Sequence, residues 1–345
     1  MKRLVFLLIV SVISVLLVTG CAQPNDPDEN VDVTYLELVK TYETVAYVED
    51  FEVTDDNIYI AEDAAGFSIW DNESGELMYR SDTLNITSVK QIEVLEENDL
   101  MMIYNEYGTG AGVYFYDIST IDNPQQAWYH TGNTKDLEQI DIWSVDYNRI
   151  RFSWIYDGTK YYTGEWIWQT FPGWYQDINT FEGNTFGFGF NSFDEDLDNS
   201  RLYCAAGELG AKIIDREDFN VISSISTKGQ TITVKVVDNV AFLGNREEGI
   251  QLFDISDELN PVEIYNYDTT GLASDVAVSS ELNVFAYAST SGGIYLFRGP
   301  NGEIERLQRI DDNEIGYTTQ VKIAGNYLYA GTRYGVYKFE IKNLR

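Results

Sequence analysis

The residue types that most enzymes use for catalysis or metal binding are scarce in this sequence. It contains one histidine, His130, and two cysteines, Cys21 and Cys204. Without further histidines, neither a Ser/His/Asp triad nor a histidine-based metal site can be assembled. The 56 acidic residues allow many carboxylate pairs, so a glycosidase that uses two carboxylates is the enzymatic alternative. We therefore expect a protein that is not an enzyme, and we keep that alternative open.

Aromatic residues gather between Arg151 and Phe193, in the segment that departs most from the rest of the chain. Phe171, Trp174 and Tyr175 fall in a predicted loop, where exposed rings can bind sugar rings or a partner protein. Trp166 and Trp168 alternate along a predicted strand, which favours packing between sheets. A carbohydrate-active enzyme on this chain would need two carboxylates in a pocket beside Trp174 or Tyr175.

An acidic run offers one weak candidate for a calcium site. Asp194, Asp196 and Asp198 have the alternating spacing that opens a calcium-binding loop. The sixth position of such a loop is glycine and the twelfth is glutamate, but this chain has Asn199 and Ala205 there. A solvated turn is the competing interpretation, so we expect no cofactor, with Ca²⁺ as the alternative.

The elements that must position these residues are repeated along the chain. Turn asparagines lie between two β-like runs in each repeat, at Asn57, Asn98, Asn148, Asn199, Asn239, Asn283 and Asn326. A glycine then opens a third run, at Gly66, Gly112, Gly164, Gly210, Gly249, Gly293 and Gly335. Seven repeats of about 45 residues, each with about four strands, predict an all-β, seven-bladed β-propeller.

The ends of the chain are predicted to complete one blade together. Too few residues follow Gly335 for a fourth strand, and the missing length matches a strand that begins near Thr34. The N-terminal strand should therefore complete the last blade and leave no open sheet edge.

A polar residue precedes each of several innermost strands that would line the central channel. These residues are Asp50, Gln91, Gln139, Asp275 and Gln320. They form either a ring at the mouth of the channel, where a ligand could approach, or a hydrated structural ring.

Two blades share a short signature, Asp254-Ile255-Ser256 with Asn260-Pro261 and Asp117-Ile118-Ser119 with Asn123-Pro124. The signature resembles that of the LVIVD-repeat family, and the resemblance covers about residues 45–340. It implies a β-propeller of a bacterial or archaeal surface, in a family mostly without assigned activity. The aspartate and serine side chains are expected to bind loop amides, which is a structural role.

The N-terminus has the pattern of a secreted, lipid-anchored protein. A basic start and the apolar run Leu4–Val18 are typical of a signal peptide. Val18-Thr19-Gly20-Cys21 resembles a bacterial lipobox, which implies cleavage before Cys21 and lipidation of its thiol. We expect a signal peptide at 1–20, an acidic tether at 21–32 and the propeller domain at 33–345.

Charge narrows the class of partner. The chain carries 23 Lys+Arg against 56 Asp+Glu, a net charge of −33, so nucleic acid is an improbable partner. With Cys21 lipidated, Cys204 has no disulfide partner and is expected to be a small buried residue. We predict a lipid-anchored scaffold in the cell envelope, on the extracytoplasmic side of the membrane (outer membrane or cell surface). Its partner would be a protein or a glycan.

Overall fold

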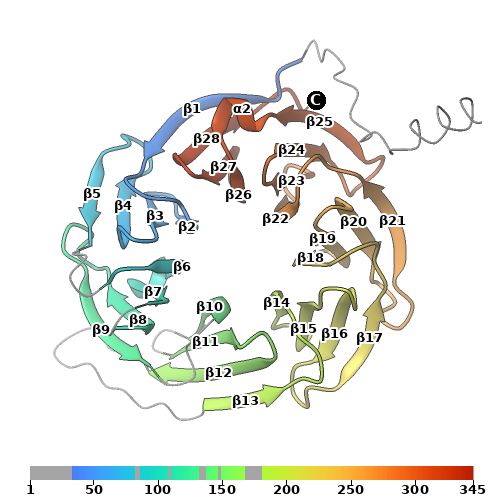
Figure 1. Cartoon of the computed structure of the whole chain (residues 1–345), viewed down its shortest axis with the longest axis horizontal. Helices are drawn as coiled ribbons and strands as arrows, with labels where there is room; N and C mark the ends of the chain where they lie inside the picture. Colours follow the sequence, from blue (N-terminus) through green and yellow to red (C-terminus); the bar gives the residue numbers. More distant parts are fainter. Residues whose placement is uncertain are drawn as a thin grey trace, which may run out of the picture. The chain divides into compact units, whose positions relative to one another are not determined.

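Seven antiparallel four-stranded sheets form a ring around a central channel (Figure 1). In this computed structural model the described residues are 33–81, 86–107, 110–131, 137–146, 149–167 and 181–344, and the side chains of 145–146, 166–167 and 181–183 are not described. All of them belong to one compact unit, Val31–Arg345. The predicted seven-bladed β-propeller is confirmed.

Each blade is a meander whose first strand lies at the channel and whose fourth strand lies at the circumference. Blade one consists of β2 (Asp50–Val53), β3 (Asn57–Ala61), β4 (Phe67–Asp71) and β5 (Leu77–Arg80). Blade two consists of β6 (Val89–Leu95), β7 (Leu100–Asn105), β8 (Gly112–Asp117) and β9 (Gln125–His130). Blade three consists of β10 (Leu137–Asp146), β11 (Arg149–Tyr156), β12 (Lys160–Ile167) and β13 (Phe181–Thr185). Blades four and five consist of β14 (Ser192–Asp196), β15 (Arg201–Ala205), β16 (Ala211–Asp215) and β17 (Val221–Ile225), and of β18 (Thr233–Val237), β19 (Val240–Gly244), β20 (Ile250–Asp254) and β21 (Val262–Tyr267). Blade six consists of β22 (Ala273–Ser279), β23 (Val284–Ser289), β24 (Gly293–Arg298) and β25 (Glu305–Ile310), and blade seven of β26 (Thr318–Ala324), β27 (Tyr327–Thr332), β28 (Gly335–Ile341) and β1 (Leu36–Glu43).

Among the described residues, two short helices occur in connections, η1 (Glu96–Asn98) between β6 and β7 and α2 (Asp312–Ile315) before β26. In the part of the chain that the structure describes, no helix has the length and apolar character needed to cross a membrane.

The N-terminal strand completes the last blade, as predicted. β1 pairs antiparallel with β28, with Leu36 opposite Ile341 and Glu43 opposite Gly335. The side chain of Asn72 reinforces this closure from blade one: it accepts hydrogen bonds from the Tyr329 hydroxyl at 3.0 Å and from Lys338 Nζ at 2.8 Å. The ring is therefore closed by a strand pair and by a buried polar contact.

Hydrophobic packing occurs between the blades. Seven hydrophobic clusters are present, and each draws its residues from two adjacent sheets, such as Ile69 with Ile103 and Phe242 with Phe285. The middle strands are consequently buried on both faces, and all six residues of β7 are buried. These strands lack a solvent-facing side because a neighbouring blade covers each of their faces.

The predicted turns lie at the right places, but asparagine is the left-handed residue in only some of them. Among the described turn asparagines, Asn239 and Asn283 have positive φ, at 62° and 51°. In other turns the left-handed residue is a neighbour of the asparagine, for example Asp99 beside Asn98 and Ser200 beside Asn199. Residue 148 lies outside the described residues.

One of the seven glycines does not open a strand. Gly164 lies inside β12, where a Cβ would stand 2.6 Å from Cζ of Phe152. Glycine is required there because the Phe152 ring packs against the backbone. The third strand of blade three begins four residues earlier, at Lys160.

Candidate functional site

The five polar residues predicted for the channel lie inside the innermost strands rather than before them. Asp50 is the first residue of β2, and the other four each follow a register shift near the start of their strand. These shifts fall at Val89/Gln91, Leu137/Gln139, Ala273/Asp275 and Thr318/Gln320. A β-bulge re-aims side chains, so each strand directs two consecutive residues into the channel.

Most of these side chains accept a hydrogen bond from the next blade. The Ile92 amide donates to Asp50 Oδ2 at 2.9 Å, the Ile140 amide to Gln91 Oε1 at 2.6 Å, and the Val321 amide to Asp275 Oδ2 at 3.0 Å. Gln139 accepts from the Phe193 amide at 2.8 Å and donates to the Phe193 carbonyl at 3.0 Å. Because the first strand is a sheet edge with unpaired amides, these contacts satisfy the backbone and join the blades.

The fifth residue, Gln320, does not continue this pattern. Its Oε1 is buried and has no hydrogen-bond partner within the described chain. Blades seven and one are joined in the channel by a different contact, the ion pair between Lys322 and Glu52. The structure therefore brings all five predicted residues to one cavity and gives four of them a structural hydrogen bond.

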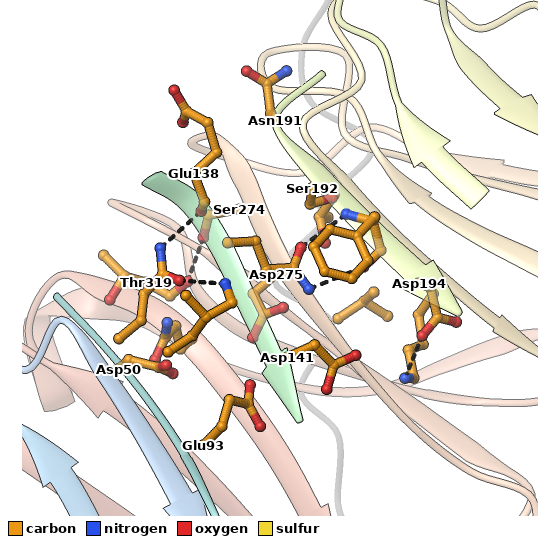
Figure 2. Close-up of a pocket in the computed structure, with 18 of the residues that line it drawn as sticks. Asp50, Glu93, Glu138, Asp141, Asn191, Ser192, Asp194, Ser274, Asp275 and Thr319 are labelled. Atoms are coloured by element: carbon orange, nitrogen blue, oxygen red, sulfur yellow. Dashed lines mark hydrogen bonds and ion pairs between the residues drawn. The ribbon is translucent and has the colours of Figure 1, made fainter. Parts of the chain in front are cut away.

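This cavity, which we call the channel mouth, has a volume of about 740 Å³ and is lined by the starts of the innermost strands (Figure 2). Nine acidic and three basic side chains of the described residues line it, so its formal charge is −6. The first residue of each bulge pair also lines the mouth, namely Lys90, Glu138, Ser274 and Thr319. These residues were not predicted, because the alternation of apolar and polar residues in a strand does not reveal the position of a bulge.

Carboxylates crowd together deeper in the channel. Figure 2 shows Asp50, Glu93 and Asp141 facing the same space. Burial, the largest cause, raises the pKa of Asp50 and of Asp141 to about 7, and it raises that of Asp275 to about 6. Burial and repulsion from Glu52 hold the pKa of Glu93 well above its usual range. The mouth therefore gains negative charge as pH rises through neutrality.

Two lysines offset part of this charge. Burial opposes the ionised form of Lys322, but the carboxylates of Glu52 and Glu93 raise its pKa. Lys235 lies 2.7 Å from Asp194 Oδ1, and this carboxylate raises the lysine pKa. Both lysines are thus held as cations, and the mouth keeps an excess of carboxylates.

Two of the three aspartates proposed for calcium make contacts with other residues. Asp194 lies in β14 and accepts from the Val236 amide at 2.7 Å, besides its contact with Lys235. Asp196 accepts from the side chain of Asn199 at 2.8 Å, and Asp198 lies in the following turn. Within the described ranges, no group of three or more His, Cys, Asp or Glu side chains is arranged to hold a metal ion.

The remaining candidates have mixed outcomes. Phe171, Trp174 and Tyr175, as well as Cys21, lie outside the described residues. Cys204 is fully buried, as expected, and His130 ends the outer strand β9. The structural role of the Asp-Ile-Ser signature is confirmed for its aspartates, because the Ser119 and Ser256 amides donate to Asp117 and Asp254, each at 2.9 Å.

Comparisons with known proteins support the fold alone. No protein-family model matches the sequence, and no curated protein matches it. The chain is similar in structure to Chaetomium thermophilum Raptor, with 13% identity, a TM-score of 0.67 and coverage of 89% of this chain but 30% of Raptor. It is also similar to the computationally designed Ika8 protein, with 14% identity, a TM-score of 0.59 and coverage of 89% of this chain and 100% of Ika8. The resemblance to LVIVD repeats and the lipid anchor stay predictions.

Proposed function

We propose that this protein is a binding scaffold that holds a cationic segment of a partner protein at the channel mouth. The β-propeller fold suits a protein-binding role. The observation that carries the proposal is a cavity of about 740 Å³ lined by nine acidic and three basic side chains. A concave site of one charge sign focuses the field and attracts ligands of the opposite sign.

The location of this scaffold is part of the proposal. The lipobox-like Val18–Cys21 supports a lipid anchor on the extracytoplasmic side of a bacterial membrane. Mass spectrometry of the N-terminus of protein purified from its membrane tests this directly. A diacylated Cys21 at the N-terminus is expected, and an unmodified start at another residue would contradict the anchor.

The binding proposal is tested with a fluorescent lysine-rich peptide and fluorescence anisotropy over a range of salt concentrations. Because the whole chain carries a charge of −33, a variant must be compared with one that loses equal charge elsewhere. The mouth variant combines Glu106→Gln with Glu138→Gln, and the control combines Glu247→Gln with Glu248→Gln at a turn outside the mouth. We expect the mouth variant to bind about three- to tenfold more weakly than the control. Equal affinities of the two variants would refute the mouth as the binding site.

The rival function, a carbohydrate-active enzyme at the blade-three loop, stays an untested prediction. Its flanking residues Trp174 and Tyr175 lie outside the described residues. Asp50, Glu93, Asp141 and Asp275, whose pKa values are raised, lie in the channel instead, where Asp50 and Asp275 accept backbone hydrogen bonds. The charge of the mouth therefore supports binding in preference to catalysis.

A further inference from the structure

Whereas the mouth lies at the starts of the first strands, a second cavity lies between blades three and four, near the ends of their third strands. Its volume is about 350 Å³, and β11, β12 and the turn between β16 and β17 line it. The mouth is lined by the starts of the first strands, whereas Arg216, Glu217 and Phe219 follow the end of a third strand. The two cavities are therefore separate sites.

The pairing of β11 with β12 explains which side chains face this cavity. Tyr161, Thr163 and Glu165 alternate along β12, so they lie on one face of the sheet. Across the pair, Glu165 lies opposite Arg151 and forms an ion pair with it. At the position of Thr163, the third strands of blades two and six carry the apolar residues Phe115 and Leu296.

A buried network fixes the guanidinium of Arg216 at the wall of the cavity. Arg216 Nε donates to Glu195 Oε2 at 2.6 Å. The other carboxylate oxygen of Glu195 accepts from the hydroxyls of Ser153 and Tyr161, each at 2.8 Å. The guanidinium also lies 5.2 Å from the centre of the Trp143 ring. Its position is therefore determined without any ligand.

Two polar atoms in this wall have no partner of their own. Arg216 Nη2 and Thr163 Oγ1 are both buried, and neither forms a hydrogen bond within the described chain. Both residues line the cavity. Leaving a buried donor unsatisfied is costly, so a ligand in the cavity gains free energy by pairing with these two atoms once the side chains of Thr163 and Arg216 turn toward it.

The charges of the wall define the kind of ligand. Arg216 is paired with Glu195 and Arg151 with Glu165, while Glu217 adds an exposed carboxylate. The charged side chains that line the cavity, Arg151, Arg216, Glu165 and Glu217, have a formal charge of zero, which favours neither an anion nor a cation. A neutral ligand with hydroxyl groups can accept from Arg216 and Thr163 and donate to Glu217. Phe219, a partly buried ring in the same wall, provides an apolar surface.

We propose that this cavity is a binding site for a neutral sugar residue. Its volume lies at the lower end of the range for small-molecule sites, which suits one or two sugar rings. The site is independent of the channel mouth, and the binding of a cationic peptide does not require it.

The test is saturation-transfer difference NMR on the mature protein with glucose, galactose, mannose and N-acetylglucosamine as probes. Glucuronic acid and glucosamine serve as the anionic and cationic comparison sugars. We expect saturation transfer to at least one neutral sugar in preference to both charged sugars. Transfer to no neutral sugar, or only to a charged sugar, would overturn the proposal.

Variants locate the bound sugar. Thr163→Val keeps the side-chain shape and removes the unsatisfied hydroxyl, so it should fold normally, which a thermal melt checks. We expect Thr163→Val and Glu217→Gln each to weaken sugar binding about three- to tenfold, and the distant Glu247→Gln to have no effect. Wild-type affinity in both cavity variants would mean that the sugar binds elsewhere and that the assignment is wrong. Binding of the lysine-rich peptide should be unchanged in Thr163→Val, which separates this proposal from the proposed function.

Discussion

Replacing Asp275 with asparagine should make the protein less sensitive to pH. Burial raises the pKa of Asp275 to about 6 from its ordinary value of 3.8. A carboxyl with a raised pKa in the folded state adds stability at low pH, and this stability is lost as pH rises through the folded value. The wild-type protein should therefore lose stability, through this group, between about pH 4 and about pH 7.

The size of the effect follows from the two pKa values. The complete shift corresponds to about 3 kcal/mol, at about 1.4 kcal/mol for each unit of pKa. Between about pH 5 and about pH 8, the linkage relation leaves about 1.4 kcal/mol, because the Asp275 carboxyl of the unfolded chain is already mostly ionised at the lower pH. Asparagine keeps an acceptor for the Val321 amide, which donates to Asp275 at 3.0 Å, so any further cost should be a constant offset.

Urea unfolding at a series of pH values measures this effect. The difference in the free energy of unfolding between Asp275→Asn and wild type should move by about 1.4 kcal/mol in favour of the variant from about pH 5 to about pH 8. Glu247→Gln, which removes an exposed charge, should show no such change. A difference that stays constant with pH, or that moves in favour of wild type, would refute the reasoning that burial governs this carboxyl.

Three further predictions concern the ring and the mouth. Asn72→Ala should lower the free energy of unfolding, measured by urea unfolding, by about 2–4 kcal/mol, because the buried Lys338 Nζ loses the side-chain acceptor 2.8 Å away. A loss below about 0.5 kcal/mol would contradict the role of Asn72 in closing the ring. Gln139→Ala should cost about 1–2 kcal/mol because it leaves the Phe193 amide and carbonyl without partners, whereas the exposed Glu247→Gln should cost almost nothing in the same assay; equal costs would be inconsistent with the bond pattern. Anisotropy titrations of the lysine-rich peptide should show affinity rising about tenfold from about pH 5 to about pH 8 as the channel carboxylates ionise, and a flat or falling profile would count against them as the binding groups.

The fold could be predicted because its determinants are local and repeated. Each blade needs tight turns at fixed spacing, and these turns require a small set of residue types. The origin of the closing strand could also be predicted, because the length missing after Gly335 matched a strand beginning near Thr34, and β1 does pair with β28. The identity of the left-handed residue was harder to predict, because a neighbour such as Asp99 or Ser200 can adopt that conformation in place of asparagine.

The sites were less predictable because they combine residues from different blades. The second cavity joins Thr163 in β12 with Arg216 after β16, and its signal in the sequence is only the alternation of polar residues from Tyr161 to Glu165. In a third strand such alternation means that the face toward the next blade is not filled by apolar side chains. Polar positions where other blades have apolar ones are thus a sign of a cavity between blades.

The channel shows how one strand can serve both structure and binding. At each bulge the second residue, such as Gln91 or Gln139, accepts an amide of the next blade and cannot change without weakening the ring. The first residue also lines the mouth, but its contacts with the neighbouring blade do not pair a strand amide: Lys90 forms ion pairs with Glu49 and Asp63, and Ser274 donates to the Thr319 carbonyl. A substitution at a first residue therefore changes the charge of the mouth and leaves the amide bond of the second residue in place. The specificity of a partner should therefore depend on the first residues of the bulges, and the polar ring predicted from the sequence serves mainly to hold the blades together.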